Sequence, residues 1–110
     1  MKSSVVRLRR PRAGDYGRVV ALHGELYARE FGYDATFEAL VAGIVAEFVD
    51  NFDPERERCW IAEMGGEVVG SVFLVRKSRS VSKLRLLIIH PRARGRGLGK
   101  RLTRACIHSP

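Results

Sequence analysis

Hydrophobic positions recur along this chain with two different periods, and the period changes near residue 58. Between residues 34 and 50 they show offsets of 3, 4, 7, 8 and 11, which define one face of an α-helix: Phe37, Leu40, Val41, Ile44, Val45 and Phe48. We therefore predict a helix that begins near Asp34. An earlier helix is predicted from Asp15, as its N-cap, to about Glu30, with Gly32 as its terminator.

The later part of the chain has the alternation of strands. Cys59–Glu63 and Val68–Val75 flank a Gly65-Gly66 pair, which is a strong hairpin signal. The polar turn 78–82 leads to a further strand, Lys83–Ile89, and Val5–Arg9 is a predicted first strand. Residues 98–107 form an amphipathic helix with one apolar face: Leu98, Leu102, Ala105 and Cys106. The order predicts one α+β domain over residues 1–110.

A glycine-rich basic loop, Arg92–Lys100, joins the last strand to the last helix. Glycines at 95, 97 and 99 let the backbone approach a ligand closely, because no Cβ stands in the way. The first turn of a helix offers unpaired N–H groups and partial positive charge. The arginines and the lysine add full charges. We predict an anion site, with pyrophosphate as its ligand.

The glycine spacing excludes two common nucleotide loops. A dinucleotide fold needs G-x-G-x-x-G, and a Walker loop needs a glycine at position 94 and Ser or Thr after Lys100; neither pattern is present. Arg94, Gly97 and Gly99, after the strand exit Ile89-His90-Pro91, instead resemble the acetyl-CoA loop of the GNAT N-acetyltransferases, Arg/Gln-x-x-Gly-x-Gly/Ala. A flexible Arg-Gly linker is disfavoured, because a strand and an amphipathic helix bracket the loop.

The resemblance implies a GNAT-like, mainly antiparallel mixed sheet with helices on both faces. It also implies that acetyl-CoA is the co-substrate and that an amine attacks it directly, which makes the chain an acyltransferase acting on an unidentified amine acceptor. The main chain of the last strand would bind the pantetheine arm, at Leu87, Ile88 and Ile89. The loop would bind the pyrophosphate, through Arg94, Gly95, Arg96, Gly97, Leu98, Gly99 and Lys100.

Several longer stretches resemble one subgroup, the acetyltransferase half of bacterial proteins that fuse a MarR-type regulator to a GNAT domain: residues 26–34, 51–63, 70–78 and 83–87. A full GNAT domain continues with a fifth strand, a fourth helix and two more strands. We therefore expect a C-terminally truncated domain of doubtful activity. There are two alternatives: the chain is a fragment of a longer product, or a partner chain completes the sheet edge that the strand Lys83–Ile89 would leave exposed.

Charge leaves a second class of function open. Residues 68–110 hold 11 basic side chains and no acidic one, whereas residues 1–67 hold 9 basic and 12 acidic ones. Such a half-chain attracts anions, including nucleic acid. Binding to single strands needs exposed aromatic residues among the basic ones, and Phe73 is the only aromatic residue after Trp60. A basic nucleic-acid-binding module and a non-catalytic acetyl-CoA-binding module are therefore the alternatives to an enzyme.

The remaining residues add little specific chemistry. No apolar run is long enough for a membrane span or a signal peptide, so we expect a cytoplasmic protein without membrane contact. Cys59 and Cys106 have no metal-ligand spacing and are expected to be buried thiols. The catalytic base is not identified by the sequence; Glu30, Glu63, His23 and His90 are candidates of equal standing.

Overall fold

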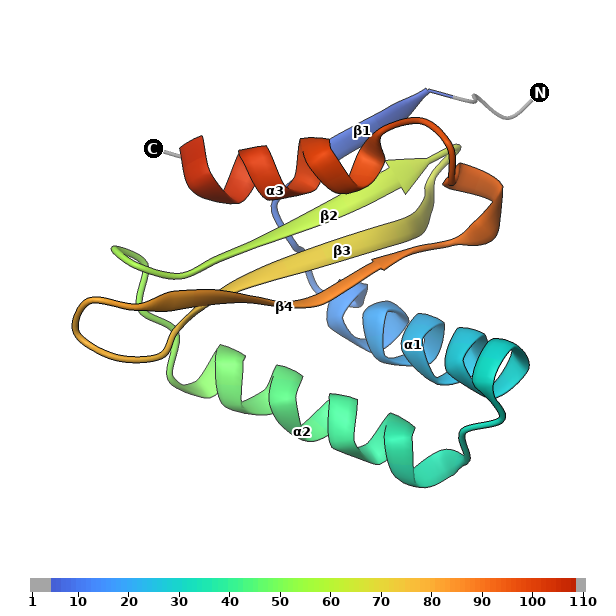
Figure 1. Cartoon of the computed structure of the whole chain (residues 1–110), viewed down its shortest axis with the longest axis horizontal. Coiled ribbons are helices and arrows are strands. Elements are labelled where there is room, and N and C mark those ends of the chain that lie inside the picture. The colour runs from blue at the N-terminus through green and yellow to red at the C-terminus, as the bar shows by residue number, and fades with distance from the viewer. Residues whose placement is uncertain (1–4, 109–110) are drawn as a thin grey trace.

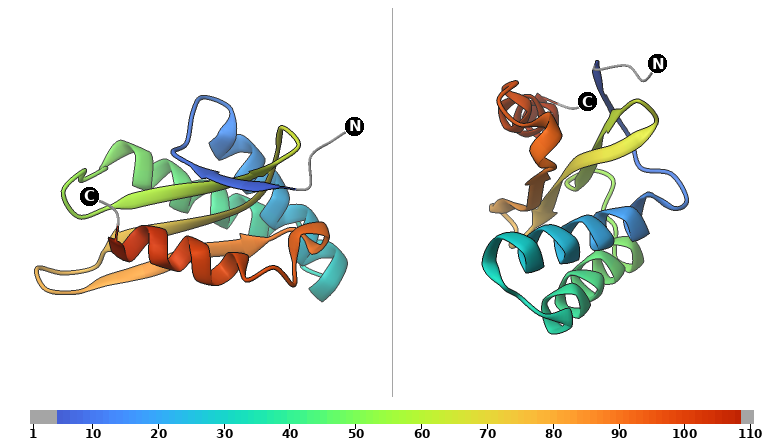
Figure 2. Two further views of the ribbon diagram at one scale, coloured as in Figure 1. Left: turned by 90° about the horizontal axis from the view of Figure 1, so that it is seen from above. Right: turned by 90° about the vertical axis from the view of Figure 1, so that its right-hand side faces the viewer.

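The computed structural model describes residues 5–108 and consists of three layers (Figures 1 and 2). The elements follow in the order β1 (Val6–Arg9), α1 (Asp15–Phe31), α2 (Ala35–Asp50), β2 (Arg58–Met64), β3 (Glu67–Arg76), β4 (Ser82–Ile89), a short 3-10 helix (Pro91–Ala93) and α3 (Leu98–His108). Helices α1 and α2 cover one face of the sheet and α3 covers the other. The predicted α+β fold with helices on both faces is confirmed.

The four described strands form one antiparallel sheet in the order β1-β2-β3-β4. Gly65 and Gly66 join β2 to β3 with φ of 59° and 81°, the left-handed pair that a tight hairpin requires. Strand β4 pairs with β3 on one side only, so its other edge is free among the described strands. This edge carries the candidate site.

Each face of the sheet has its own apolar core. On the α3 side, Leu98, Leu102 and Cys106 pack against sheet residues that include Ala62 and Val72. On the other side, Phe48 of α2 meets Phe73 of β3 edge to face, with ring centroids 4.9 Å apart. Both cysteines are buried and free, as predicted. Burial raises the pKa of the Cys106 thiol to about 11, so it stays protonated at neutral pH.

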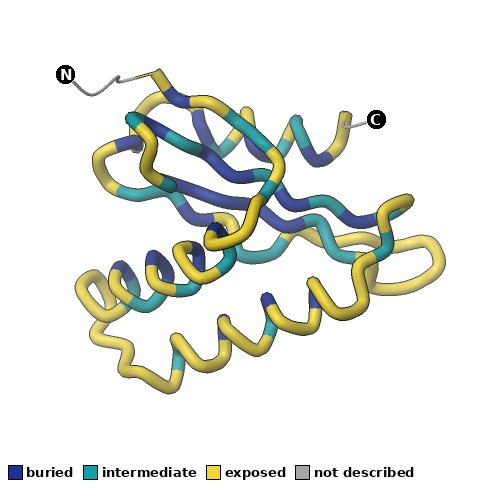
Figure 3. Tube along the Cα trace, turned by 180° about the vertical axis from the view of Figure 1, so that it is seen from behind, coloured by how far each residue is buried: buried dark blue, intermediate teal, exposed yellow. Residues whose placement is uncertain are grey.

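The apolar stripe of α2 is narrower than its sequence predicts. Val41, Val45 and Phe48 are buried, but Leu40 is 59% exposed, so its expected place on the core-facing stripe is wrong. Helix α2 packs mainly against α1, and only one face of α2 contacts the sheet. Much of the surface of α2 is therefore exposed (Figure 3). Asp34 caps α2 by accepting from the Thr36 N–H at 2.9 Å, next to the predicted start of this helix, and Gly32 ends α1 with φ of 71°, as predicted.

Asp15 is not the N-cap of α1. Gly14 takes that position, with φ of 94°, and Asp15 is the first helical residue. Its buried carboxylate accepts from the Arg9 guanidinium at 2.6 Å and from the Arg12 N–H at 2.7 Å, and so ties β1 to the start of α1. The hydrogen bond from Arg9 is the main reason that the pKa of Asp15 lies below its usual value of 3.8. The Asp15 carboxylate therefore forms an ion pair with Arg9 of β1 and does not cap the helix.

Asp15→Asn should lower the free energy of unfolding by about 2 kcal/mol at pH 7, because it weakens a charged hydrogen bond in a buried position. The folded-state pKa is depressed, so this stabilisation is complete above the unfolded pKa and is lost as the pH falls through the folded one. Urea unfolding at pH 7 and pH 3 measures both values. A difference between wild type and variant that does not shrink at pH 3 would contradict the assignment.

Candidate functional site

The chain leaves the sheet through a tight turn at the end of β4. The His90 N–H donates to the Val69 carbonyl at 2.7 Å, and His90 Nδ1 accepts from the Arg92 N–H at 3.1 Å. Pro91 opens the 3-10 helix, where its missing N–H removes no helical hydrogen bond. The buried Ala93 anchors the turn in the α3-side core. The turn thereby carries the chain from the free edge of β4 to the face that α3 covers.

Gly95 and Gly97 then place the loop in front of α3 with φ of 79° and 69°. A Cβ at either position would have no neighbouring heavy atom within 4 Å, so both glycines face open space. Gly99 has no such conformation, and a Cβ there would make an ordinary contact of 3.6 Å with Ile89 Cδ1. The left-handed backbone therefore requires glycine at 95 and 97 and not at 99.

The start of α3 has unsatisfied donors. Its first helical hydrogen bond runs from the Arg101 N–H to the Gly97 carbonyl at 3.2 Å. Within residues 5–108, the N–H groups of Gly95, Gly97, Leu98, Gly99 and Lys100 donate to no protein acceptor. No acidic residue lies in the first turn of the helix. The loop thus combines free amides, the positive end of a helix dipole and the nearby charges of Arg96 and Lys100.

Strand β4 contains a bulge next to this loop. Ile88 pairs with Ser71 and Arg85 with Phe73, so Leu86 and Leu87 together oppose one residue of β3. Leu86 has φ of 52°, a conformation that is rare for a leucine, and its carbonyl accepts from Ser71 Oγ at 2.9 Å. The hydroxyl therefore supports the strand where the regular ladder is interrupted.

The main chain of Ile89 faces the free edge. Because His90 and Val69 are hydrogen-bonded across the ladder, the next pair, Ile89 and Gly70, is not, and the polar groups of Ile89 point away from β3. Arg94 Nε donates to the outward Ile89 carbonyl at 3.1 Å, which agrees with this alternation. Ile88 itself lies in the ladder opposite Ser71, and its side chain is buried against Leu22 and Leu26 of α1.

Arg94 joins the strand edge to helix α1. Its guanidinium Nη1 also lies 2.9 Å from a Glu30 carboxylate oxygen. Its other terminal nitrogen has no partner within the described part of the chain. A groove of about 330 Å³ lies beside the pair, lined from α1 by Leu26, Tyr27, Glu30 and Phe31 and from the strand and loop by Leu87, Ile88, Ile89 and Arg94.

The structure therefore arranges the ten predicted site residues in two adjoining parts. Leu87, Ile88, Ile89 and Arg94 line the groove, and Gly95 to Lys100 form the loop and the start of α3. Of the α1 wall of the groove, sequence reasoning named only Glu30, as a candidate base. It did not find the apolar part, where Tyr27 stacks on Phe37 with ring centroids 4.5 Å apart. The only signal was the apolar stripe of α1, which is equally typical of an ordinary core helix.

The four candidate bases lie in different surroundings. Glu63 is on β2, two strands from the free edge, and forms ion pairs with Arg9 and Arg12. His23 is buried in α1, and its Nδ1–H donates to the Val19 carbonyl at 2.8 Å. Glu30 lines the groove in its pair with Arg94. His90 lies at the end of β4, so Glu30 and His90 are the two candidates close to the predicted site residues.

Desolvation, followed by the positive charges of Arg92, Arg29 and Arg94, lowers the pKa of His90 below its usual 6.5. The imidazole is therefore neutral at pH 7, with Nδ1 occupied as an acceptor. Among residues 5–108, no three His, Cys, Asp or Glu side chains are grouped to hold a metal ion. No helix of that range combines the length and hydrophobicity needed to cross a bilayer.

Comparison with known proteins identifies the family. Residues 55–109, half of the chain, match the model of the acetyltransferase (GNAT) domain, and the chain belongs to this family. Its fold is similar to that of a GNAT-family acetyltransferase from Staphylococcus aureus, with a TM-score of 0.75 and 16% identity over 94% of this chain. A putative GNAT acetyltransferase from Desulfovibrio desulfuricans gives 0.71, also at 16% identity over 94% of the chain.

A transcriptional regulator from Bacillus halodurans is also similar, with a TM-score of 0.61 and 19% identity; 94% of this chain covers 72% of that one. The TM-scores establish a shared fold, and the closeness to regulator-fused domains stays a prediction. The chain spans 65% of the length of each of the first two structures. No curated protein matches it significantly. The family model and the fold together assign the chain to the acetyltransferase (GNAT) domains.

The pKa of His90 should be measurably below 6.5 in an NMR titration of its ring protons. Arg92→Gln should raise the pKa toward 6.5, because it removes a neighbouring positive charge, whereas Arg104→Gln, on α3, should leave it unchanged. A His90 pKa that is the same in Arg92→Gln and in wild type would show that this arginine does not act on the imidazole.

Proposed function

We propose that this chain binds acetyl-CoA at the free edge of β4 and the start of α3, and transfers the acetyl group to a primary amine. The observation that supports this most strongly is the row of unpartnered amides at the left-handed glycines 95 and 97 and in the first turn of α3. An anion at a helix start is stabilised by such donors and by the helix dipole.

The residues present fit the ligand that the family uses. Open space in front of Gly95 and Gly97 leaves room for a pyrophosphate, and the amides of Gly95, Gly97, Leu98, Gly99 and Lys100 would donate to its oxygens. The charges of Arg96, Lys100 and the free nitrogen of Arg94 would add to this. Hydrogen bonds to charged groups contribute about 1.5–3 kcal/mol each, so a few of them give micromolar affinity.

The free edge of β4 would bind the pantetheine arm of acetyl-CoA. The outward N–H of Ile89 offers a donor that suits an extended chain containing amides, and the Ile89 carbonyl, which accepts from Arg94 Nε, keeps a second lone pair. Leu87 lies at the bulge. Ile88 would act indirectly, because its side chain holds the strand against α1. Acetyl-CoA supplies an activated thioester there.

The residues near the bulge suit an amine acceptor. His90 is neutral at pH 7 and Glu30 is a carboxylate, so either group is chemically able to take a proton. The groove of about 330 Å³ gives an acceptor access from the α1 side. The α1 wall would therefore contribute to the choice of amine, together with any part of a longer protein that covers this edge.

Gly97→Val should weaken acetyl-CoA binding by about tenfold or more, because the side chain fills the space that the pyrophosphate needs. Isothermal titration calorimetry gives the dissociation constant. Gly66→Val is the matched control: Gly66 has φ of 81° and equally open surroundings, but it lies in the β2–β3 turn. It should suffer the same backbone strain and keep its affinity. Equal affinities of wild type and Gly97→Val would remove the loop from the proposal.

A further inference from the structure

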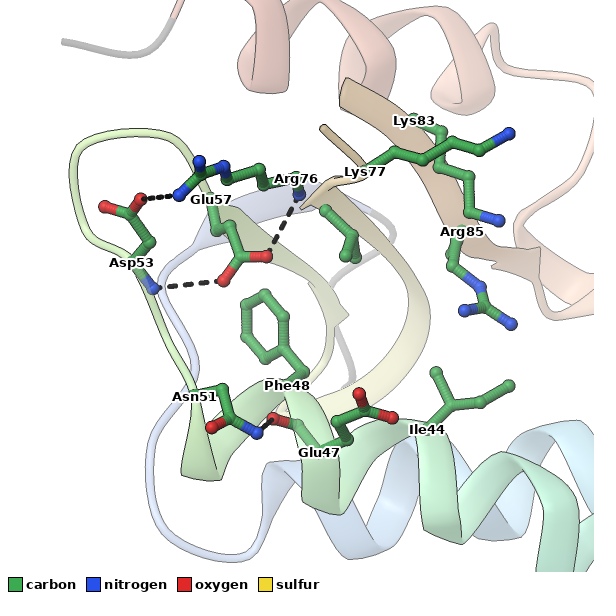
Figure 4. Close-up of a pocket in the computed structure, with 11 residues that line it drawn as sticks. Ile44, Glu47, Phe48, Asn51, Asp53, Glu57, Arg76, Lys77, Lys83 and Arg85 are labelled. Carbon is green, nitrogen blue, oxygen red and sulfur yellow. Dashed lines mark hydrogen bonds and ion pairs between the residues drawn. The ribbon is translucent and has the colours of Figure 1, made fainter. Parts of the chain in front are cut away.

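A second cavity, of about 450 Å³, lies between the C-terminal half of α2 and the β3–β4 hairpin (Figure 4). Ile44, Glu47 and Phe48 form its α2 wall, and Lys77, Lys83 and Arg85 form its hairpin wall. Its volume is in the range of small-molecule sites. It shares strand β4 with the groove described above, and Arg85 directly precedes the Leu86–Leu87 bulge.

Some of the charged groups in this cavity have structural partners. The buried Glu57 carboxylate accepts from the Asp53 N–H and from the Arg76 N–H, each at 3.0 Å. Arg76 also lies 3.9 Å from Asp53 in an ion pair. These contacts, visible in Figure 4, fasten the segment after α2 to the end of β3. They hold the Glu57 carboxylate within the protein, where both of its oxygens accept from main-chain N–H groups.

The other charged groups have no partner in the described residues. Lys77, Lys83 and Arg85 make no ion pair or side-chain hydrogen bond, and neither does the Glu47 carboxylate on the opposite wall. Arg85 and Lys83 pair across the strands with Phe73 and Val75, so both project on the α2 side of the sheet. Three neighbouring cations repel one another where a counter-ion is absent. The hairpin wall, across the cavity from Glu47, therefore favours an anionic group on its own side.

We propose that this cavity binds the far end of the acceptor, the end away from the reacting amine, and that the acceptor is a small primary amine that carries a carboxylate or a phosphate group. Lys83 and Arg85 bind the anionic group, and the amine lies toward the bulge. This rests on the proposed acetyl transfer at the same strand. Arg85 directly precedes the Leu86–Leu87 bulge, so the two ends of the acceptor lie near neighbouring residues of one strand and a short carbon chain separates them.

Isothermal titration of the chain with 4-aminobutyrate and with butylamine tests this chemistry. We expect 4-aminobutyrate to bind about tenfold more tightly than butylamine, because the amine alone has no group for the cationic wall. In a second arm, 3-aminopropylphosphonate replaces the carboxylate by a doubly charged anion; tighter binding than 4-aminobutyrate assigns the site to a phosphate. Equal affinity for 4-aminobutyrate, the phosphonate and butylamine would overturn the proposal.

Arg85→Gln and Lys83→Gln should each weaken binding of the tighter of the two anionic amines by about tenfold and leave acetyl-CoA affinity within about threefold. Arg79→Gln is the matched control, because Arg79 lies in the same hairpin outside the cavity wall, and it should bind like wild type. Lys83 is exposed, so Lys83→Gln should fold and still test the proposal if Arg85→Gln does not fold. If Lys83→Gln binds the anionic amine as tightly as wild type does, the assignment of this cavity is wrong. If the wild-type chain does not bind acetyl-CoA, the proposed function is wrong instead.

Discussion

The candidate site depends on how helix α3 begins. Gly95 and Gly97 turn the chain through left-handed conformations, and the first amides of the helix then donate to no acceptor within residues 5–108. The position of those amides is fixed by packing, because Leu98 and Leu102 are buried against the sheet within the first two turns. The apolar contact along one face of the helix thereby holds the polar donors at its N-terminal end, ready for an anion without further ordering of the backbone.

Strand β4 connects this helix start with the rest of the site. Its bulge at Leu86–Leu87 interrupts the ladder, and beyond it the main chain of Ile89 faces the free edge. Arg94 bridges the Ile89 carbonyl and Glu30, so one side chain links the loop, the strand and helix α1. One strand thus positions three features in sequence: the cation-lined cavity, the bulge and the anion loop.

Much of the fold and the loop was predictable, because these features depend on local sequence. Helical periodicity located α1 to α3, and the glycine spacing located the loop. Asp15 was misassigned because an aspartate at a helix start is usually a cap, whereas here the distant Arg9 is its partner. The Leu86 bulge left no signal, since leucine has no preference for a positive φ. The pair Glu30–Arg94 and the cation-lined cavity arise from tertiary packing of separate segments, which periodicity does not reveal.

The central claim is that bare main-chain amides at the start of α3 bind the pyrophosphate of acetyl-CoA. The most direct measurement is a series of ¹H–¹⁵N correlation spectra of the chain during titration with acetyl-CoA. The account predicts that the largest amide shifts occur at Gly95, Gly97, Leu98, Gly99 and Lys100, with smaller ones along the edge of β4. Shifts confined to other parts of the chain, with those five amides unmoved at saturation, would contradict it.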